Sequence, residues 1–358
     1  MNVLCLGGGL QGVEAVFLGH KADWTMTVVD RNPKAPATGL ADYVIEADLL
    51  TLEPRQLMTL SSGFDFIIAA LEDGEVISEV SALSADNHIP PVIIDPEPYF
   101  LSASKIKSKQ LFHRLSLPMA APWRPNSAGS FVAKPSGSSG SRGVVYFDNS
   151  EAVEKQFPSA ASQENLVIEQ RLDGPQYSVE VTARQGQARS WPVTRLEMDA
   201  VSDCCRVIAP SGLSPERERE FGNMACQLAK ELGLTGLMDL EAVDCQGEFK
   251  LLEIDARFPS QTPTAIFFST GINLLEEMAA CFVPITPKSP SEGLSCPRRV
   301  IYEHIQSKNG VQSCLGEHIM TSRGPLISVP GFLGATEALV SRDWTNNDFV
   351  ATLIWVND

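Results

Sequence analysis

The sequence predicts an α/β protein with more than one domain. Three observations support this fold class. Apolar strand-like runs alternate with helical patterns over the first 95 residues, and a Gly/Ser-rich segment at 136–143 separates two further apolar runs. The third observation is the segment 237–264, which has the pattern of two strands interrupted by acidic residues. At 358 residues, the chain is long enough for two or three domains.

Composition narrows the class of protein. A hydrophobic content of 44% and a charged content of 20% are typical of a globular protein, and no apolar run reaches the ~20 residues of a membrane span. The first residues lack the basic start of a signal peptide, and the eight cysteines form no CxxC pair, so we expect reduced thiols in the cytoplasm. The net charge of −16 argues against nucleic acid or a membrane as a partner.

The N-terminal segment predicts a Rossmann-like domain over residues 1–95. A strand at Val3–Leu6 is followed by the glycine turn Gly7–Gly12, a helix from Val13 and a second strand at Thr25–Asp30. The glycines fit GxGxxG in the strand–turn–helix context that a dinucleotide-binding fold requires. Many such domains bind other ligands, so an NAD-dependent dehydrogenase remains one interpretation. Further strands are expected at Tyr43–Ala47, Phe64–Leu71 and Val92–Ile94.

Three acids, Asp30, Asp48 and Glu72, follow these predicted strands. Ligands bind at the carboxyl ends of strands in open α/β sheets, so these acids are candidate ligand contacts. They are equally well explained as helix caps. Beyond the sheet, a helix at 103–115 carries Lys105, and a lysine on an exposed helix usually only solvates it.

A hairpin with a polar tip follows. Ser130–Lys134 and Gly143–Phe147 are predicted strands, and Ser136–Arg142 is the loop between them. Glycines let backbone N–H groups approach phosphate oxygens closely, serines add donors, and Lys134 can reach the same phosphates. The alternative is a mobile surface hairpin. Later strands are expected at Asn165–Gln170 and 177–183, and a long amphipathic helix at 215–232 leads into the acidic hairpin.

The acidic hairpin is the most informative stretch. Glu241 interrupts its first strand and Glu253 and Asp255 its second, with Arg257 following. Strand side chains alternate faces, so the last three point the same way. Magnesium prefers such oxygen ligands, and a solvated hairpin face is the alternative. A two-residue turn puts Glu241 and Glu253 on opposite faces, whereas an odd loop or a bulge puts them side by side. The magnesium site requires the second arrangement.

The order of these parts resembles the ATP-grasp carboxylate–amine ligases over nearly the whole chain. The resemblance implies an ATP-grasp fold with a Rossmann-like (pre-ATP-grasp) N-terminal domain and a small β-rich C-terminal domain. We expect domains at 1–95, 96–285 and 286–358, the second divided into a phosphate-loop part at 103–168 and a metal-hairpin part at 169–285. More narrowly, the stretch LEIDARFPSQTPT at 252–264 is similar to ligases that join 3-methyl-D-ornithine to the ε-amine of L-lysine in pyrrolysine biosynthesis.

The resemblance assigns roles residue by residue. Lys105 and Lys134 are expected at the ATP phosphates under the loop Ser136–Gly143, which includes Gly137, Ser138, Ser139, Gly140 and Ser141. Glu169 and Gln170 are expected at the adenine. Glu241, Glu253 and Asp255 are the expected ligands of two Mg²⁺ ions. Candidates for the amino-acid substrates are Glu72, Ser178, Glu180, Arg206, Asp239, Arg257, Ser260 and Thr262, and further ligand contacts are assigned to Leu10, Gln11, Asp30, Asp48 and Leu49.

The implied chemistry passes through an acyl phosphate. Arg257 and Lys134 would stabilise the transferred phosphoryl group, and Glu180 or Asp239 would accept the proton of the amine. A homodimer is a further expectation from the family. The competing interpretations are another ATP-grasp ligase, such as a purine-biosynthetic carboxylase-like enzyme, a dehydrogenase, and a nucleotide-binding regulator without catalysis.

Overall fold

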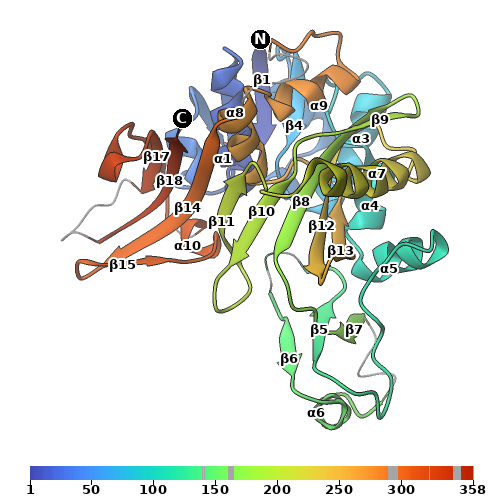
Figure 1. Cartoon of the computed structure of the whole chain (residues 1–358). Coiled ribbons are helices and arrows are strands. Elements are labelled where there is room, and N and C mark those ends of the chain that lie inside the picture. Colours follow the sequence, from blue (N-terminus) through green and yellow to red (C-terminus); the bar gives the residue numbers. More distant parts are fainter. Residues whose placement is uncertain are drawn as a thin grey trace.

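The computed structural model describes residues 1–138, 140, 142–159, 165–288, 297–321, 323–341 and 348–357. Ser139 and Ser141 of the predicted phosphate loop lie outside these ranges. Three sheets organise the chain, with four, three and eleven strands (Figure 1). The predicted mixed α/β content and the β-rich C-terminal region are both present.

The first sheet is the predicted Rossmann-like domain. Its strands lie in the order β3-β2-β1-β4 and are all parallel. They are β1 (Asn2–Leu6), β2 (Thr25–Asp30), β3 (Tyr43–Glu46) and β4 (Phe66–Ala69), with helices α1 (Leu10–Lys21), α2 (Pro54–Leu60) and α3 (Gly74–Ala85) and the 3₁₀ turns η1 (Pro36–Gly39) and η2 (Leu49–Thr51). The strand expected at Val92–Ile94 contributes only an isolated bridge between Val92 and Ile67.

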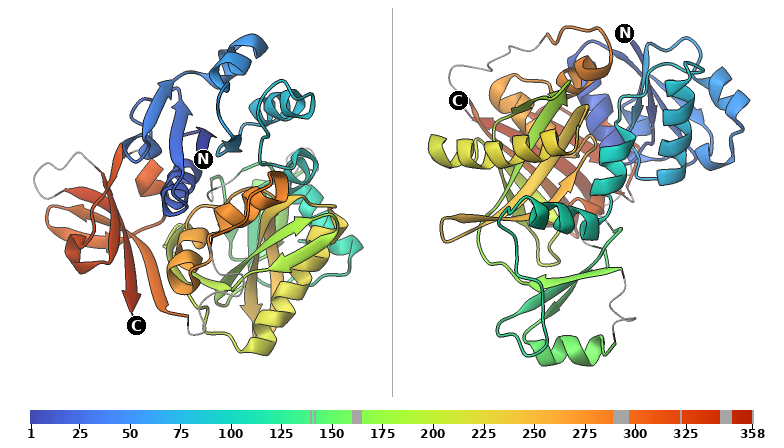
Figure 2. Two further views of the ribbon diagram at one scale, coloured as in Figure 1. Left: turned by 90° about the horizontal axis from the view of Figure 1, so that it is seen from above. Right: turned by 90° about the vertical axis from the view of Figure 1, so that its right-hand side faces the viewer.

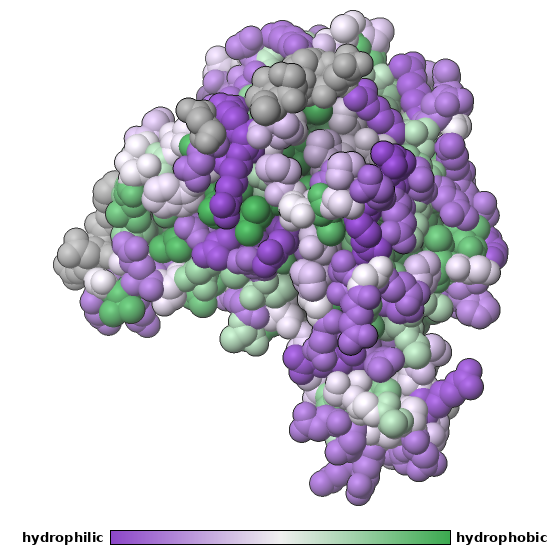
Figure 3. All heavy atoms as spheres, in the orientation of Figure 1, coloured by the Kyte–Doolittle hydropathy of each residue, from purple (hydrophilic) through white to green (hydrophobic). Residues whose placement is uncertain are grey.

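The second sheet forms a small projecting lobe (Figure 1). It has the order β6-β5-β7 and contains β5 (Phe131–Pro135), β6 (Val145–Phe147), β7 (Leu166–Gln170) and the helix α6 (Ser150–Gln156). Its own core is a cluster of apolar side chains around Phe131 and Val153. Hydrophilic side chains cover much of the outside of this lobe (Figure 3). The lobe therefore has a core of its own, and β5 pairs with β6 as the predicted hairpin.

The third sheet has eleven strands, ordered β13-β12-β8-β10-β11-β14-β18-β17-β16, with β9 beside β8 and β15 beside β14. The strands are β8 (Gln176–Arg184), β9 (Gln187–Ser190), β10 (Thr194–Met198), β11 (Cys204–Ala209), β12 (Gly236–Cys245), β13 (Glu248–Asp255), β14 (Arg299–Lys308), β15 (Val311–Cys314), β16 (Leu326–Ser328), β17 (Glu337–Ser341) and β18 (Phe349–Asn357). Because β11 pairs directly with β14, the proposed boundary at 285 divides the chain but not the sheet.

Helices cover this large sheet (Figure 2). They are α4 (Pro96–Ser102), α5 (Lys105–Arg114), α7 (Pro215–Glu231), α8 (Thr262–Thr270), α9 (Leu274–Phe282) and α10 (His318–Thr321), with the 3₁₀ turn η4 (Phe332–Gly334). Within the described part of the chain no single helix has the length and apolarity to cross a membrane, although α8 and α9, bent at 108°, satisfy both criteria as a pair.

A buried carboxylate ties the Rossmann-like domain to the large sheet. Glu14 of α1 is 2% exposed, and its Oε1 accepts the backbone N–H of Thr264 at 2.6 Å. Gln261, the residue before α8, gives no side-chain cap, so Glu14 satisfies one of the free N–H groups of that helix. At the other end of α1, Asn273 Nδ2 donates to the carbonyl of Leu18 at 2.9 Å. Helix α1 is thus fixed to α8 and α9 at both ends.

The Glu14 carboxyl should make stability fall as pH rises. Burial raises its pKa from 4.5 to about 7, so above pH 4.5 the folded protein keeps a proton that the unfolded chain releases. Between about pH 4.5 and 7, we expect wild type to lose roughly 3 kcal/mol of unfolding free energy relative to Glu14→Gln, with the loss complete above pH 7. Denaturant unfolding at pH 5, 6, 7 and 8 measures the difference, with exposed Glu151→Gln as control. Parallel pH profiles for wild type and Glu14→Gln would refute it.

Candidate active site

The acidic hairpin has the register that a metal site requires. The turn between β12 and β13 has only two residues, Gln246 and Gly247, so regular pairing would leave Glu253 on the face opposite Glu241. A β-bulge after Glu241 makes Leu252 the extra residue, and Glu241 then pairs directly with Glu253. Asp239 likewise pairs with Asp255. The condition set by the sequence is met, by the bulge rather than by the turn.

The neighbouring strand extends this acidic face. In the pairing of β12 with β8, Asp239 lies opposite Glu180 and Glu241 opposite Ser178. The Ser178 hydroxyl donates to Glu180 Oε1 at 3.2 Å, and Glu180 is completely buried. Among the described residues, Glu180 Oε2 and Asp239 Oδ1 are buried without a hydrogen-bond partner. Unpaired buried oxygens are costly, so this face is suited to a cation or a hydrogen-bond donor that binds there.

The pKa values reflect this crowding of negative charge. Burial, with Glu253 and Asp255 nearby, raises the pKa of Glu241 to about 8. Burial and the same kind of repulsion raise the pKa of Asp239 well above its usual range, and burial raises that of Asp255 to about 6. Burial also acts on Glu253, but Lys105, Lys134 and Arg257 together outweigh it and lower the pKa of Glu253. The cluster as a whole therefore favours binding of positive charge.

Two cations approach the acids from opposite sides. Arg257 lies 2.8 Å from Glu72 Oε1 and 3.2 Å from Asp255 Oδ2, and its side chain is 13% exposed. Glu72 comes from the Rossmann-like domain, so this pair joins that domain to the hairpin. Lys105, the first residue of α5, lies 2.6 Å from Glu253 Oε2 and donates to the carbonyl of Ser138 at 2.9 Å. Lys105 thus connects the glycine-rich loop to the acidic hairpin.

The start of the glycine-rich loop is fastened to α5. The Ser136 carbonyl accepts the Lys105 N–H at 2.9 Å, and the Ser136 hydroxyl lies 3.0 Å from that of Ser104. Ser138 donates its hydroxyl to the Arg142 carbonyl at 2.7 Å. The loop is therefore held over the same edge of the sheet that carries Glu253.

A large hollow separates the lobe from the large sheet. We call it the interlobe pocket; it encloses about 1670 Å³, solvent included. Its walls include Lys105, Val132, Lys134, Ser138, Gly140, Arg171, Leu172, Gln176, Val243, Leu252, Glu241 and Glu253. The apolar side chains of Val132, Val243 and Leu252 can pack against a flat ring. Lys134 and Lys105 can supply cations, and the loop can supply N–H donors, to the phosphates of a ligand.

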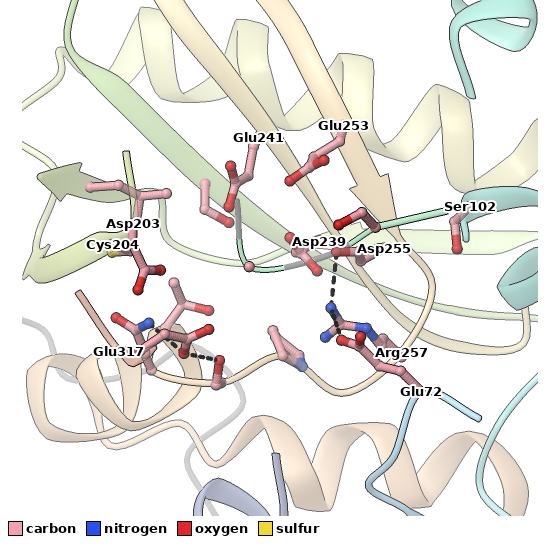
Figure 4. Close-up of a pocket in the computed structure, with 18 of the residues that line it drawn as sticks. Glu72, Ser102, Asp203, Cys204, Asp239, Glu241, Glu253, Asp255, Arg257 and Glu317 are labelled. Carbon is pink, nitrogen blue, oxygen red and sulfur yellow. Dashed lines mark hydrogen bonds and ion pairs between the residues drawn. The ribbon is translucent and has the colours of Figure 1, made fainter. Parts of the chain in front are cut away.

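A second hollow, the acidic pocket, adjoins it and encloses about 1150 Å³, solvent included. Its walls include Glu72, Asp203, Asp239, Glu241, Glu253, Asp255 and Glu317, with Lys105 and Arg257 as the cations. Figure 4 shows these carboxylates converging on one space. Lys105, Glu241 and Glu253 line both pockets, so the two hollows meet at these side chains. A group can pass from a ligand in one pocket to a ligand in the other at this junction.

Several predicted substrate contacts lie in the acidic pocket. Glu72, Ser178, Asp239, Arg257, Ser260 and Thr262 line it, as do Gly137, Ser138 and Gly140 of the loop. Glu180 does not line the pocket: it is completely buried and accepts the Ser178 hydroxyl.

Arg206 is not brought to this site. In β11 the pairing shifts at Cys205, so Arg206 lies opposite Glu197, while Val207 lies opposite Leu196, which lines the acidic pocket. The bulge turns Arg206 to the other face, where it bonds to Glu303 at 2.9 Å and Glu197 at 2.6 Å. The family resemblance assigns Arg206 to the substrates, and the bulge gives it the other face of the sheet.

The two residues predicted to contact the adenine do not line the interlobe pocket. Glu169 is buried and holds two lysines, Lys134 at 3.0 Å and Lys109 at 2.7 Å. Neither Glu169 nor Gln170 lines the interlobe pocket, whose wall is formed by the following residues, Arg171 and Leu172. Glu169 thus fixes the lysines near the pocket.

The N-terminal glycine turn is hydrogen-bonded to neighbouring parts of the chain at Gly8. Asp30 Oδ2 accepts the Gly8 N–H at 2.7 Å, and Ala37 donates its N–H to the Gly8 carbonyl at 2.9 Å. A Cβ at Gly8 would meet the Ala35 Cβ at 2.7 Å, whereas a Cβ at Gly9 would meet nothing within 4 Å. The Asp30 carboxylate, the candidate ribose contact, is thus hydrogen-bonded to the backbone of the turn.

The other N-terminal candidates also lie outside both pockets. Asp48 caps the turn η2 through the Leu50 N–H, and neither Leu10 nor Leu49 lines either pocket. Gln11 comes nearest, because its Nε2 donates to Glu72 Oε1 at 3.3 Å. It contacts the site only through that carboxylate.

Sequence reasoning missed four side chains. Lys109 lies three residues before Phe112 on α5, a helix that the sequence predicts to be exposed to solvent. Its side chain is nevertheless only 13% exposed, and its Nζ bonds to Glu169. Its i, i+4 spacing from Lys105 was the available indication. Asp203, Gln261 and Glu317 line the acidic pocket and come from loops far apart in sequence, and no local pattern distinguishes them.

The carboxylates fit magnesium. Glu241, Glu253 and Asp255 offer hard oxygen donors on one face, and burial together with repulsion among them raises the pKa values of Glu241 and Asp255. Within the described ranges, no three His, Cys, Asp or Glu side chains form a ready cage. Magnesium at nucleotide sites uses one or two carboxylates and completes its shell with water and phosphate oxygens, so a protein cage is not required.

Fold and site together define an ATP-grasp ligase. The ATP-grasp domain family matches residues 102–261. The ADP complex of an N5-carboxyaminoimidazole ribonucleotide synthetase superposes with a TM-score of 0.71 at 16% identity, covering 100% of this chain and 92% of that one. Biotin carboxylase from Campylobacter jejuni gives a TM-score of 0.73 at 15% identity, covering 99% and 87%. At such identities these likenesses support the fold alone.

Sequence relatives narrow the class. A 3-methyl-D-ornithine–L-lysine ligase from Methanosarcina acetivorans is 33% identical over 326 residues, covering 90% of this chain and 84% of the relative. The ligase of the same name from Methanosarcina mazei is 32% identical, covering 90% and 82%. The chain belongs to the family of these 3-methyl-D-ornithine–L-lysine ligases, known as PylC. It is an ATP-dependent ligase that forms amide bonds.

Proposed function

We propose that the protein joins the carboxylate of 3-methyl-D-ornithine, or of D-ornithine, to the ε-amine of L-lysine in pyrrolysine biosynthesis, and releases ADP and phosphate. One observation carries the proposal: a strongly acidic pocket with unpaired buried oxygens meets the interlobe pocket at Lys105, Glu241 and Glu253. Both amino acids carry two amino groups, so their positive charge complements this pocket. A ribonucleotide substrate would bring a phosphate into the same negative environment, which argues against a purine-biosynthetic ligase.

In this proposal ATP occupies the interlobe pocket. The adenine would lie between Val132 and Leu252, beside the backbone of Arg171 and Leu172. Lys134 and Lys105 would contact the phosphates, with the loop 136–143 over them. Glu241, Glu253 and Asp255 would hold two Mg²⁺ ions. When bound, magnesium neutralises phosphate charge and polarises the γ-phosphoryl group.

The first step activates the carboxylate. An oxygen of the ornithine carboxylate attacks the γ-phosphorus, the bond to the β-phosphate oxygen breaks, and ADP leaves with an acyl phosphate formed. Arg257 is fixed between Glu72 and Asp255, so its guanidinium is oriented before the substrate binds. We assign it to the substrate carboxylate and the transferred phosphoryl oxygens, where a planar cation suits the developing charge.

The second step forms the amide. The lysine ε-amine attacks the acyl carbon, phosphate leaves, and the amine gives up a proton. Asp239 faces the pocket, has a pKa well above its usual range and has an unpartnered Oδ1 among the described residues. These properties favour Asp239 as the proton acceptor. Glu180 lies opposite Asp239 on the neighbouring strand β8, and burial raises its pKa to about 7. It would keep that region of the sheet polar.

The same proposal covers assembly and location. We retain the three-domain division and a homodimer as proposals. We also propose a cytoplasmic protein, supported by the seven cysteines of the described ranges, all of which are unpaired thiols.

The test is ADP release by purified protein with Mg²⁺ and ATP. D-Ornithine and L-lysine are supplied singly and then together, and the products are weighed by mass spectrometry. We expect ADP in quantity only with both, together with a product of ornithyl-lysine mass. ADP release with a different acid–amine pair would replace the substrates but keep the ligase.

A further inference from the structure

One end of the acidic pocket is formed by three side chains that the phosphate chemistry does not use: Asp203, Gln261 and Glu317. Glu317 precedes α10 in the C-terminal region, outside the residues that match the ATP-grasp family. Figure 4 shows Glu317 and Asp203 at the end of the pocket away from Arg257. The two cations of the pocket, Lys105 and Arg257, are already paired with Glu253 and with Glu72 and Asp255. At this end Asp203 Oδ2 is paired with the His318 ring, and no ion pair found among the described residues involves Glu317.

Glu317 is held so that one oxygen is left for a ligand. The Ser260 hydroxyl donates to its Oε2 at 2.8 Å, and Gln261 Nε2 donates to the same atom at 2.7 Å. Neither of these bonds uses Oε1. Since Glu317 also lines the acidic pocket, its second oxygen is available there for a hydrogen-bond donor.

Gln261 gives a second, independent indication of a ligand. A carboxylate accepts only from the amide nitrogen, so the bond to Glu317 turns Gln261 Oε1 away from it. Gln261 is 5% exposed, lines the pocket, and its Oε1 has no hydrogen-bond partner in the described part of the chain. A buried carbonyl oxygen without a donor is unfavourable, so a donor on a bound ligand would satisfy it.

The backbone holds this acceptor in place. Gln261 has φ 72° and ψ −58°, and the Thr262 N–H donates to the Ser260 carbonyl at 2.9 Å, which together form a γ-turn with a positive central φ. This turn is rare and strained for a residue with a side chain, and such strain is concentrated at ligand sites. Thr264, three residues on, is fixed by the buried Glu14.

We propose that Glu317 and Gln261 Oε1 bind a primary ammonium group of one of the two diamino-acid substrates. An –NH₃⁺ group has three donors and no acceptor, and this end of the pocket offers the carboxylates of Glu317 and Asp203 and the amide oxygen of Gln261. The inference rests on the proposed function. The ammonium belongs either to the side chain of the activated diamino acid or to the α-amine of L-lysine, and the two sources can be separated.

The test uses Glu317→Gln and substrates that lack one amine. D-Norvaline lacks the terminal amine of D-ornithine, and 6-aminohexanoate lacks the α-amine of L-lysine. We measure kcat/KM for each amino acid and its analogue, or binding by calorimetry where turnover is too slow. The preference for the amine is the ratio of kcat/KM for the amino acid to kcat/KM for its analogue. In Glu317→Gln this ratio should fall by about 10- to 100-fold for one amino acid–analogue pair, because a hydrogen bond to a charged group is lost. The pair affected identifies the source.

The analogue that lacks the bound amine should react equally well, within about threefold, in wild type and Glu317→Gln. The surface variant Glu337→Gln is the control. It removes a carboxylate of β17 that pairs with Lys21, and it should leave the kcat/KM values of all four compounds unchanged. Equal losses for all four compounds, or no change in either preference, would overturn the ammonium site. If wild type released no ADP with any pair, the proposed function would fail, and calorimetry with the same four compounds would still decide the ammonium site.

Discussion

Replacing Glu253 by glutamine is expected to lower kcat/KM for ATP by about 100-fold or more. Glu253 lies where the two pockets meet, opposite Glu241 and 2.6 Å from Lys105. Glutamine keeps the size of the side chain but removes the charge that would hold Mg²⁺, and a metal contribution of several kcal/mol corresponds to two or more decades in rate. Steady-state ADP release at varied ATP and Mg²⁺ measures the loss.

A binding measurement separates a lost metal contact from a damaged fold. Wild type should gain thermal stability from Mg²⁺ and ATP together, and Glu253→Gln should gain much less at the same concentrations. Glu248→Gln is the matched control, since Glu248 lies on the same strand but is 60% exposed and paired with Lys250. Activity of Glu253→Gln within threefold of wild type would show that the hairpin does not hold the metal.

Replacing Arg257 by lysine should lower kcat by about 100- to 1000-fold while leaving ATP binding nearly unchanged. Arg257 lines the acidic pocket but not the interlobe pocket, and Glu72 and Asp255 orient its guanidinium. Lysine keeps the charge but cannot form the planar, two-pronged contacts that a carboxylate or a phosphoryl group accepts. A cation at a transferring phosphoryl group contributes about three to five decades when fully removed, so the lysine variant should retain part of this.

Steady-state kinetics with nucleotide titrations distinguish the two effects. We expect a fall in kcat with the dissociation constant for ATP within about threefold of wild type. Arg114→Lys, in a surface pair with Glu231, is the control and should behave as wild type. If Arg257→Lys weakened ATP binding and left kcat intact, Arg257 would belong to nucleotide binding and our assignment of the transferred phosphoryl group would be wrong.

Two β-bulges explain both the success and the main error of the sequence predictions. Glu241 and Glu253 were identifiable as acids in apolar strands, but the two-residue turn alone would have separated them, and the bulge at Leu252 brings them together. The bulge at Cys205 has the opposite effect on Arg206, which alternation would have placed on the pocket side with Cys204. A bulge depends on the packing of both strands, so local spacing does not reveal it.

The sequence by itself determined the α/β class, the glycine-turn domain, the hairpin loop after Lys134 and the identity of the acids at 241, 253 and 255, because periodicity and turn chemistry are local properties. Only the tertiary structure decided which face each acid occupies. It also shows that Asp30 accepts a hydrogen bond from the Gly8 N–H of the glycine turn. Finally, it brought Glu317 and Gln261 into the same pocket, because contacts between residues 56 positions apart depend on how the sheets and loops pack and not on any spacing in the chain.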